Sequence, residues 1–296
     1  MASELVGALV GWYDANAREL PWRQPDRTAW GVLVSEVMLQ QTPVRRVEPV
    51  WRTWMQRWPT PSDLAAASAG DAVRAWERLG YPRRALRLHA AATQIRDRHA
   101  GVVPDDLDEL RVLDGIGEYT AAAVATFAFG QRHAVLDTNV RRVLARAVQG
   151  RAQAAPALTA AERATATSLL PDDDATAARW AIAVMELGAL VCTARQPQCG
   201  DCPIADRCAW QLAGAPPYDG PPRRGQTWHG TDRQVRGRLL AVLRAAHRPV
   251  RRADLVRAVP DDDLRDPHQR DRCLAGLVHD GLAEPGPDDD TYALPG

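Results

Sequence analysis

The amino-acid sequence predicts a predominantly α-helical protein, and two observations support this fold class. Alanine and leucine are frequent along the 296 residues. Alternating β-branched residues, which are typical of strands, are scarce before the last dozen positions. Prolines such as Pro21 and Pro25 interrupt the helical pattern. Because 46% of the residues are hydrophobic, the chain can fill a packed core, which excludes a largely disordered protein.

The expected helices follow one another with short connections. The first covers 1–17 and the second runs from about Trp30 to Gln41. Thr42 is expected to cap the next helix, which begins with Pro43 in its first turn and extends to about Arg57. Further helices are expected near 61–68, 70–79, 83–100, 106–112, 118–129, 138–149, 160–170 and 175–191.

A stretch rich in proline and glycine, 214–229, is the expected linker between two domains, 1–213 and 230–296. The second domain contains three expected short helices, followed by a two-stranded hairpin with an acidic tip in GLAEPGPDDDTYAL. The three helices are expected at 232–246, 251–259 and 267–280. This order is typical of a winged-helix domain.

Composition narrows the function classes. The 37 arginine and lysine residues balance the 37 aspartate and glutamate residues, so a globally basic nucleic-acid binder is not indicated, although a local basic patch is compatible. All basic side chains are arginine, which excludes Schiff-base chemistry by a lysine amine. The sequence has no apolar stretch long enough for a membrane span, no secretory signal and too few cysteines for a disulfide scaffold. A cytoplasmic protein is therefore expected.

Four cysteines form the most specific motif. They have the spacing C-x6-C-x2-C-x5-C, at Cys192, Cys199, Cys202 and Cys208. Thiolates favour an iron–sulfur cluster or zinc, and the wide first gap favours a [4Fe–4S] cluster over a structural zinc site. Arg195 lies in the loop within that gap, where it is either a phosphate contact or a solvated arginine. Cys273 stands alone and is expected to be a small buried residue.

A second motif, Leu113–Ala121, contains Gly115 and Gly117 between two helical stretches. The glycines allow a tight turn, and the free N–H groups of the following helix favour an anion such as a DNA phosphate. We interpret this motif as a helix–hairpin–helix element, which grips DNA without reading its sequence. The alternative is an ordinary turn between two helices.

The segment Val34–Thr42, with the sequence VSEVMLQQT, resembles the signature of the adenine DNA glycosylases, the MutY family. Three further motifs match this family: Leu20–Arg23, Leu79–Tyr81 and Leu136–Val140. The hairpin and the cysteine spacing match the wider superfamily that includes endonuclease III. The resemblance covers about residues 5–212.

The chemistry of adenine release explains why two acids matter. The leaving base must be protonated, and the cation-like sugar must be stabilised. Glu36 lies among apolar residues, which raise the pKa of a carboxyl group and suit it as a general acid. Asp137 precedes a helix whose N–H donors are expected to keep it ionised. Considered singly, Glu36 could be a surface residue and Asp137 a simple helix cap.

The resemblance implies roles for individual residues. Glu36 protonates adenine, Asp137 stabilises or traps the sugar C1′, Asn139 orients Asp137, and Tyr119 lines the pocket. The lyase members have lysine at the position of Tyr119, so a monofunctional glycosylase is expected. When the target base leaves the stack, other residues must fill its space and hold the opposite base. The resemblance implies that these residues are Gln41, Thr42, Leu79 and Tyr81, with Tyr81 beside 8-oxoguanine. A local basic face is expected from Arg83, Arg84, Arg87, Arg141, Arg142 and Arg146.

Three features depart from the family pattern. Pro82 replaces a usual second tyrosine, Thr138 replaces a common glycine, and the C-terminal part is too short for a Nudix-like domain. A thymine or uracil mismatch glycosylase of the same fold is the first alternative. A non-catalytic DNA-binding iron–sulfur protein is the second.

Together these observations predict an all-α protein with a two-lobed helix–hairpin–helix glycosylase core, an iron–sulfur subdomain and a winged-helix-like C-terminal domain. The lobes are expected at about 24–130, a six-helix barrel, and at about 1–23 with 131–213, which would hold the cluster. The expected partner is double-stranded DNA with A·8-oxoG or A·G mispairs. We expect a monomer that does not contact membranes and is associated with the nucleoid.

Overall fold

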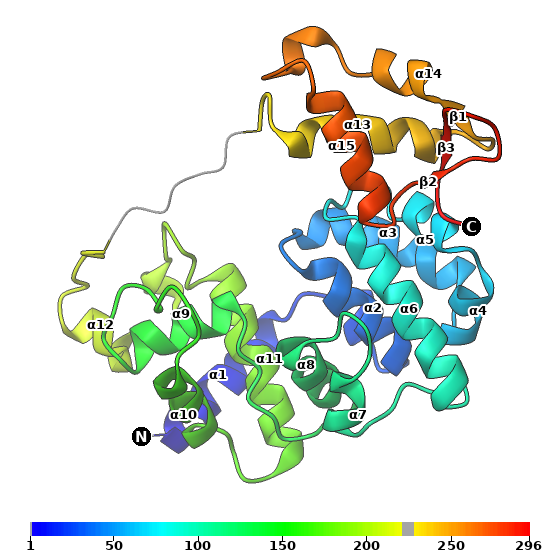
Figure 1. The fold of residues 1–296 in the computed structure, drawn as a ribbon. Coiled ribbons are helices and arrows are strands. Elements are labelled where there is room, and N and C mark those ends of the chain that lie inside the picture. Colours follow the sequence, from blue (N-terminus) through cyan, green and yellow to red (C-terminus); the bar gives the residue numbers. More distant parts are fainter. Residues whose placement is uncertain (1, 221–227) are drawn as a thin grey trace. The chain divides into compact units, whose positions relative to one another are not determined.

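The computed structural model describes residues 2–220 and 228–296 (Figure 1). These residues form two compact units, each built from separate stretches of the chain. Unit 1 contains 2–36, 104–112 and 116–220, and unit 2 contains 37–103, 113–115 and 228–296. The expected linker 214–229 lies partly outside the described residues. The expected domain and lobe boundaries therefore stay predictions.

The helices of unit 1 begin and end close to the expected positions, except for a short helix at 209–212 that was not expected. They are α1 (Ala2–Asn16), α7 (Leu107–Arg111), α8 (Glu118–Phe129), α9 (Thr138–Ala147), α10 (Ala160–Ser168), α11 (Asp174–Leu190) and α12 (Ala209–Leu212), with short 3-10 turns at Pro21–Arg23, Cys199–Asp201 and Ala205–Arg207. Helix α2 (Ala29–Leu39) continues from unit 1 into unit 2. No helix in 2–220 or 228–296 is long and apolar enough to cross a membrane.

The core of unit 1 lies where α1, α9 and α11 pack together. Leu9, Leu144 and Leu187 are among its buried side chains. Near this core, Glu186 is fully buried and accepts hydrogen bonds from Arg18 Nη2 at 2.6 Å and Arg23 Nη1 at 3.0 Å. These two arginines hold the pKa of Glu186 below its usual range, so the buried carboxylate stays charged and joins the N-terminal segment to α11.

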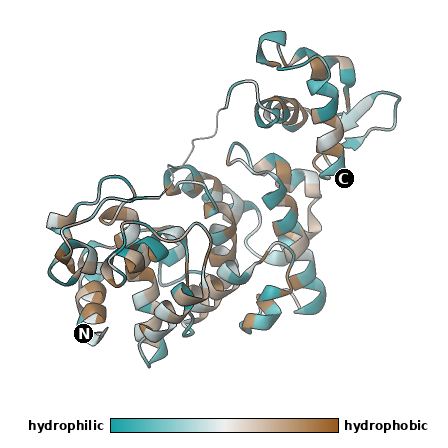
Figure 2. Cartoon of the chain, turned by 60° about the vertical axis from the view of Figure 1, so that its left-hand side comes forward, coloured by the Kyte–Doolittle hydropathy of each residue, from teal (hydrophilic) through white to brown (hydrophobic). Residues whose placement is uncertain are grey.

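Unit 2 contains four helices from the middle of the chain and a C-terminal domain. The four helices are α3 (Val44–Arg57), α4 (Pro61–Ala66), α5 (Ala69–Ala75) and α6 (Arg83–Arg98). Trp54 packs edge-to-face against Trp58 and Trp76, with ring centres 4.9 and 5.5 Å apart. Figure 2 shows that helices carry both hydrophilic and hydrophobic residues, as expected where one face covers a core.

The C-terminal domain has the winged-helix order that the sequence predicts. Its elements are α13 (Asp232–Ala245), β1 (Val250–Arg251), α14 (Arg252–Arg257), α15 (Gln269–His279), β2 (Glu284–Pro285) and β3 (Thr291–Ala293). The expected hairpin, β2–β3, is confirmed, but the sheet has a third strand that was not expected. Strand β1 pairs antiparallel with β3, with Val250 opposite Tyr292. Two residues are too short to produce an alternating pattern, so only the pairing reveals β1.

The expected cap at Thr42 is wrong. Helix α3 has Pro43 at its N-cap, and no side chain caps it. The Thr42 hydroxyl instead donates to the Leu79 carbonyl oxygen at 3.2 Å and accepts from Arg84 Nη2 at 3.0 Å. Thr42 therefore ties the end of α2 to a turn 37 residues away rather than starting a helix.

Candidate functional site

Glu36 is a buried acid on α2, with 6% of its surface exposed. The Tyr119 hydroxyl on α8 donates a hydrogen bond to Glu36 Oε2 at 2.9 Å. Burial, helped by the negative charge of Asp137, raises the pKa of Glu36 to about 7, although the Tyr119 hydrogen bond and the Arg23 charge oppose the rise. A carboxyl group with this pKa can hold or give a proton near neutral pH.

Asp137 is the N-cap of α9, as the sequence suggested. Its Oδ1 accepts from the Val140 backbone N–H at 2.6 Å, and its Oδ2 accepts from Asn139 Nδ2 at 2.7 Å. Burial raises the pKa of the Asp137 carboxyl group, while the hydrogen bonds from Val140 and Asn139 favour its charged form and oppose the rise. The donors still fix both oxygens in place, so the carboxyl group is held in one orientation.

Tyr119 interacts with the charges of both acids, Glu36 and Asp137. Its pKa is raised well above the ordinary value, first by burial and then by the charges of Glu36 and Asp137. The phenol therefore remains protonated and acts as a hydrogen-bond donor. Arg23, to which the sequence analysis gave no role, lowers the pKa of both Glu36 and Tyr119. Its only sequence signal is its place in the motif Leu20–Arg23.

The two glycines of the hairpin differ in what they require. Gly115 has a φ of 77°, and a Cβ there would approach the Arg87 Cβ to 2.6 Å, so both conformation and space require glycine. Gly117 is extended, is the N-cap of α8, and has open space where a Cβ would lie. The first turn of α8 therefore begins with no side chain over its N–H groups.

The four cysteines border one small cavity in unit 1. Apolar residues such as Leu187 and Ile204 complete its lining. No three His, Cys, Asp or Glu side chains in the described ranges are grouped as ligands of a single metal ion. Four thiols around a cavity match the donor set of an iron–sulfur cluster.

Two hydrogen bonds reach the sulfur atoms of this cavity. Gln211 Nε2 donates to Cys199 Sγ at 3.0 Å, and Arg146 Nη1 donates to Cys192 Sγ at 3.4 Å. Such donors stabilise negative charge on thiolate ligands. Arg195, in the same loop, is exposed and forms no hydrogen bond or ion pair within the part of the chain that the structure describes. This placement leaves Arg195 accessible to a phosphate.

Comparison with known proteins identifies the family. The model of the HhH-GPD superfamily of base excision DNA repair proteins matches residues 34–167, and the iron–sulfur binding domain of endonuclease III matches residues 192–208. An adenine DNA glycosylase of Mycobacterium tuberculosis (strain CDC 1551 / Oshkosh) is 56% identical over 288 residues, which cover 97% of this chain and 92% of the relative. The chain belongs to the adenine DNA glycosylase family. The predicted helix–hairpin–helix fold and [4Fe–4S] cofactor are confirmed.

Other relatives agree with this assignment. The adenine DNA glycosylase of Mycolicibacterium smegmatis is 54% identical over 93% of this chain and 91% of its own length. The Homo sapiens adenine DNA glycosylase is 41% identical over 68% of this chain and 38% of its own length. A solved thermostable thymine-DNA glycosylase has a TM-score of 0.63 at 23% identity, covering 72% of this chain and 97% of that chain. At this identity the structural likeness shows the fold alone.

The residues expected to contact DNA fall into two groups. Gln41 and Tyr81 are exposed and have positive φ values of 55° and 46°. Thr42 and Leu79 are buried, and the Thr42 hydroxyl holds the turn by donating a hydrogen bond to the Leu79 carbonyl oxygen. A non-glycine residue at positive φ is uncommon, and such backbone strain concentrates at functional sites.

The expected basic face is largely wrong, because most of its arginines are used inside the glycosylase. Arg84 is buried and donates to the carbonyl oxygens of Val37 at 2.8 Å and Met38 at 3.0 Å. It also donates to the Gly80 carbonyl oxygen at 3.0 Å, and burial lowers the pKa of Arg84 to about 10. Arg83 pairs with Asp280. Arg87 is left free of hydrogen bonds and ion pairs in the described part of the chain.

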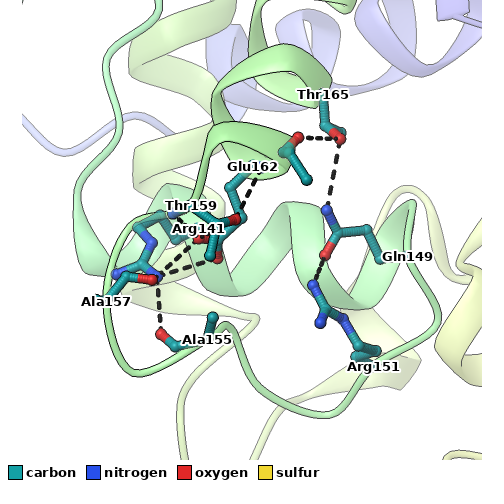
Figure 3. Close-up of polar contacts among 9 residues, drawn as sticks. Arg141, Gln149, Arg151, Ala155, Ala157, Thr159, Glu162 and Thr165 are labelled. Atoms are coloured by element: carbon teal, nitrogen blue, oxygen red, sulfur yellow. Dashed lines mark hydrogen bonds and ion pairs between the residues drawn. The ribbon is translucent and has the colours of Figure 1, made fainter.

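The three arginines of α9 are also committed internally. Arg141 binds Glu162 at 2.9 Å and the backbone oxygens of Ala155 and Ala157, so it holds the loop before α10 (Figure 3). Arg142 donates to the carbonyl oxygen of Cys192 at 2.7 Å. Arg146 donates to the carbonyl oxygen of Thr193 at 2.7 Å. Arg142 and Arg146 therefore fasten the cysteine loop to α9, and Arg141 fastens the loop before α10, so none of the three is free to present its charge to DNA.

Proposed function

We propose that this chain removes adenine from duplex DNA where adenine is mispaired with 8-oxoguanine or guanine. The observation that carries the proposal is the buried Glu36 with a pKa of about 7, in hydrogen-bond contact with Tyr119 and under the charge of Asp137. The 56% sequence identity of this chain to an adenine DNA glycosylase supports adenine as the released base.

The proposed reaction begins with proton transfer from Glu36 to the ring of an adenine that has been taken out of the base stack. A protonated base leaves as a neutral molecule, so the N-glycosidic bond breaks more easily. General-acid help of this kind is worth about 10²–10⁴ in rate. The Tyr119 hydroxyl holds the Glu36 carboxyl group in one orientation for the transfer.

Asp137 acts on the sugar side of the bond. Its carboxylate stabilises or captures the cation-like C1′, and water then completes the hydrolysis. Asn139 and the Val140 N–H hold the two oxygens, so Asp137 needs no reorientation during the reaction. Because the chain contains no lysine, no lysine amine can attack C1′, and the abasic strand is expected to stay uncut.

The proposed role of the iron–sulfur cluster is to hold the loop that carries Arg195 in place. Cys192, Cys199, Cys202 and Cys208 would hold it, and by binding one cluster they would restrain the loop that carries Arg195. An ordered loop with an exposed arginine suits a sequence-independent contact with a DNA phosphate.

The test is base release from defined duplexes. The protein should release adenine from A·8-oxoG and A·G duplexes and leave T·G duplexes intact, with strand breaks only after alkali. Glu36→Gln should bind the same duplex without releasing adenine. Thymine release from T·G without adenine release, or strand cleavage by the pure protein, would refute the proposal.

A further inference from the structure

The arginines of the C-terminal domain are mostly neutralised within it. On α15, Arg270 pairs with Asp261 at 2.7 Å, and Arg272 pairs with Asp232 at 3.2 Å and Asp266 at 3.1 Å. Each of these cations is held by carboxylates on the domain itself. Helix α15 is therefore poorly suited to phosphate binding, and the role of the domain must be sought elsewhere.

The domain is bound to α5 and α6 of the same unit. Arg244 Nε donates to the Val73 carbonyl oxygen at 2.9 Å, and Arg74 Nη1 donates to the Ala246 carbonyl oxygen at 2.8 Å. Asp280, at the end of α15, accepts from Arg83 of α6 at 3.3 Å. These contacts attach the end of α13 and the end of α15 to α5 and α6.

At the turn that precedes α6, Arg233 of α13 lies against Tyr81. The guanidinium carbon of Arg233 is 4.8 Å from the centre of the Tyr81 ring and 5.3 Å from that of the Trp228 ring. Tyr81 is 42% exposed and Trp228 is 54% exposed. Arg233 has no carboxylate partner among the described residues, so its two ring contacts are the interactions that orient it. Within these distances a guanidinium is attracted to the faces of both rings.

The turn itself is built to present Tyr81. Gly80 and Tyr81 both have positive φ, at 84° and 46°. The buried Arg84 side chain donates a hydrogen bond to the Gly80 carbonyl oxygen. Its guanidinium carbon also lies 5.6 Å from the centre of the Tyr81 ring. The backbone of the turn is thus fixed by Arg84, while the exposed ring is contacted by Arg84 at 5.6 Å and, more closely, by Arg233 at 4.8 Å.

We propose that Arg233 is a specificity-determining residue that acts through Tyr81. It is a positioning residue: its cation–π contact holds the Tyr81 ring against the base opposite the target adenine, so the C-terminal domain contributes to opposite-base discrimination. This inference rests on the proposed function and on the place beside the opposite base that the family resemblance implies for Tyr81. A ring held in one orientation stacks on a purine with a smaller entropy loss than a mobile ring.

The test compares adenine release in single turnovers from A·8-oxoG, A·G and A·C duplexes. In R233A, the preference for A·8-oxoG over A·C should fall about 2- to 5-fold, the change expected for loss of an exposed cation–π contact. R233K keeps a cation and should restore most of the preference. R248A, which removes an exposed arginine elsewhere in the domain, should match the unaltered protein.

A second measurement does not depend on activity. In protein labelled with 3-fluorotyrosine, R233A should shift the ¹⁹F resonance of Tyr81, assigned by its loss in Y81F, and R233K should shift it less. Equal slowing of all three duplexes by R233A would overturn the inference, as would an unchanged preference or an unshifted resonance. Failure of the unaltered protein to release adenine refutes the proposed function instead, and the resonance still decides whether Arg233 orients Tyr81.

Discussion

Replacing Glu36 by glutamine should stabilise the protein at alkaline pH while abolishing base release. Glu36 has a pKa of about 7 in the folded protein and 4.5 as its ordinary value. The folded state therefore binds more protons than the unfolded state between these pH values, and stability falls as pH rises through them. One unit of pKa difference corresponds to about 1.36 kcal/mol. Above pH 7 the buried carboxylate of Glu36 therefore lowers the free energy of unfolding by about 3 kcal/mol.

The glutamine variant lacks this cost. Its stability relative to the unaltered protein should therefore increase by about 2–3 kcal/mol between pH 5 and pH 8. For a chain of this size, that change corresponds to about 5–10 °C in Tm at pH 8. Thermal unfolding followed by the helical circular dichroism signal, under anaerobic conditions to preserve the cluster, measures the difference.

Glu186 offers a matched control with the opposite sign. Its pKa is lowered by Arg18 and Arg23, so the charged form is stabilised in the folded state. Glu186→Gln should lower Tm, and the loss should grow as pH rises to the ordinary pKa of glutamate, 4.5, and stay constant above it. If Glu36→Gln gained no stability at pH 8 relative to pH 5, the assignment of a neutral, proton-donating Glu36 would be refuted.

Four further outcomes are expected. The single-turnover rate of adenine release should fall about tenfold per pH unit above pH 7, because only protonated Glu36 donates; a flat profile to pH 9 would contradict this. Tyr119→Phe removes a hydrogen bond that lowers the pKa of Glu36, so the alkaline limb of the same profile should move to higher pH, measured beside the unaltered protein. Arg84→Met should lower the free energy of unfolding by about 3 kcal/mol or more, measured in urea, because several buried carbonyl oxygens lose their donor; Arg87→Met, on the same helix, serves as its control and should change little. Cys199→Ser should lose the visible absorbance of the cluster, and full retention of that absorbance would remove Cys199 from the ligand set.

Features encoded by local patterns were predictable from the sequence. Helix α8 has the expected bounds, 118–129, because glycine stands at each end of a run of helix-forming residues. The raised pKa of Glu36 followed from its apolar neighbours along α2, since burial is its largest cause. The cysteine spacing and the winged-helix order depend in the same way on positions close together in the chain.

Long-range polar contacts were not predictable from the sequence. An arginine side chain can reach several backbone oxygens, and no local pattern states whether Arg84 or Arg142 faces solvent or a distant carbonyl group. Thr42 was misassigned for the same reason, since its partner Leu79 lies 37 residues away. For Asp137 the donors were correctly expected, but the degree of burial, which decides the direction of the pKa shift, depends on packing around α9.

The contact between the first helix and α11 has a consequence for synthesis of the chain. Arg18 and its partner Glu186 are 168 positions apart. At ribosomal rates of about 5–20 residues per second, the N-terminal helix emerges on the order of ten seconds before the surface that covers Leu9. During that interval its apolar face has no native neighbour, whereas α3 to α6 can already pack on one another. Nascent chains stalled before α11 should therefore be more prone to aggregation than chains stalled after it.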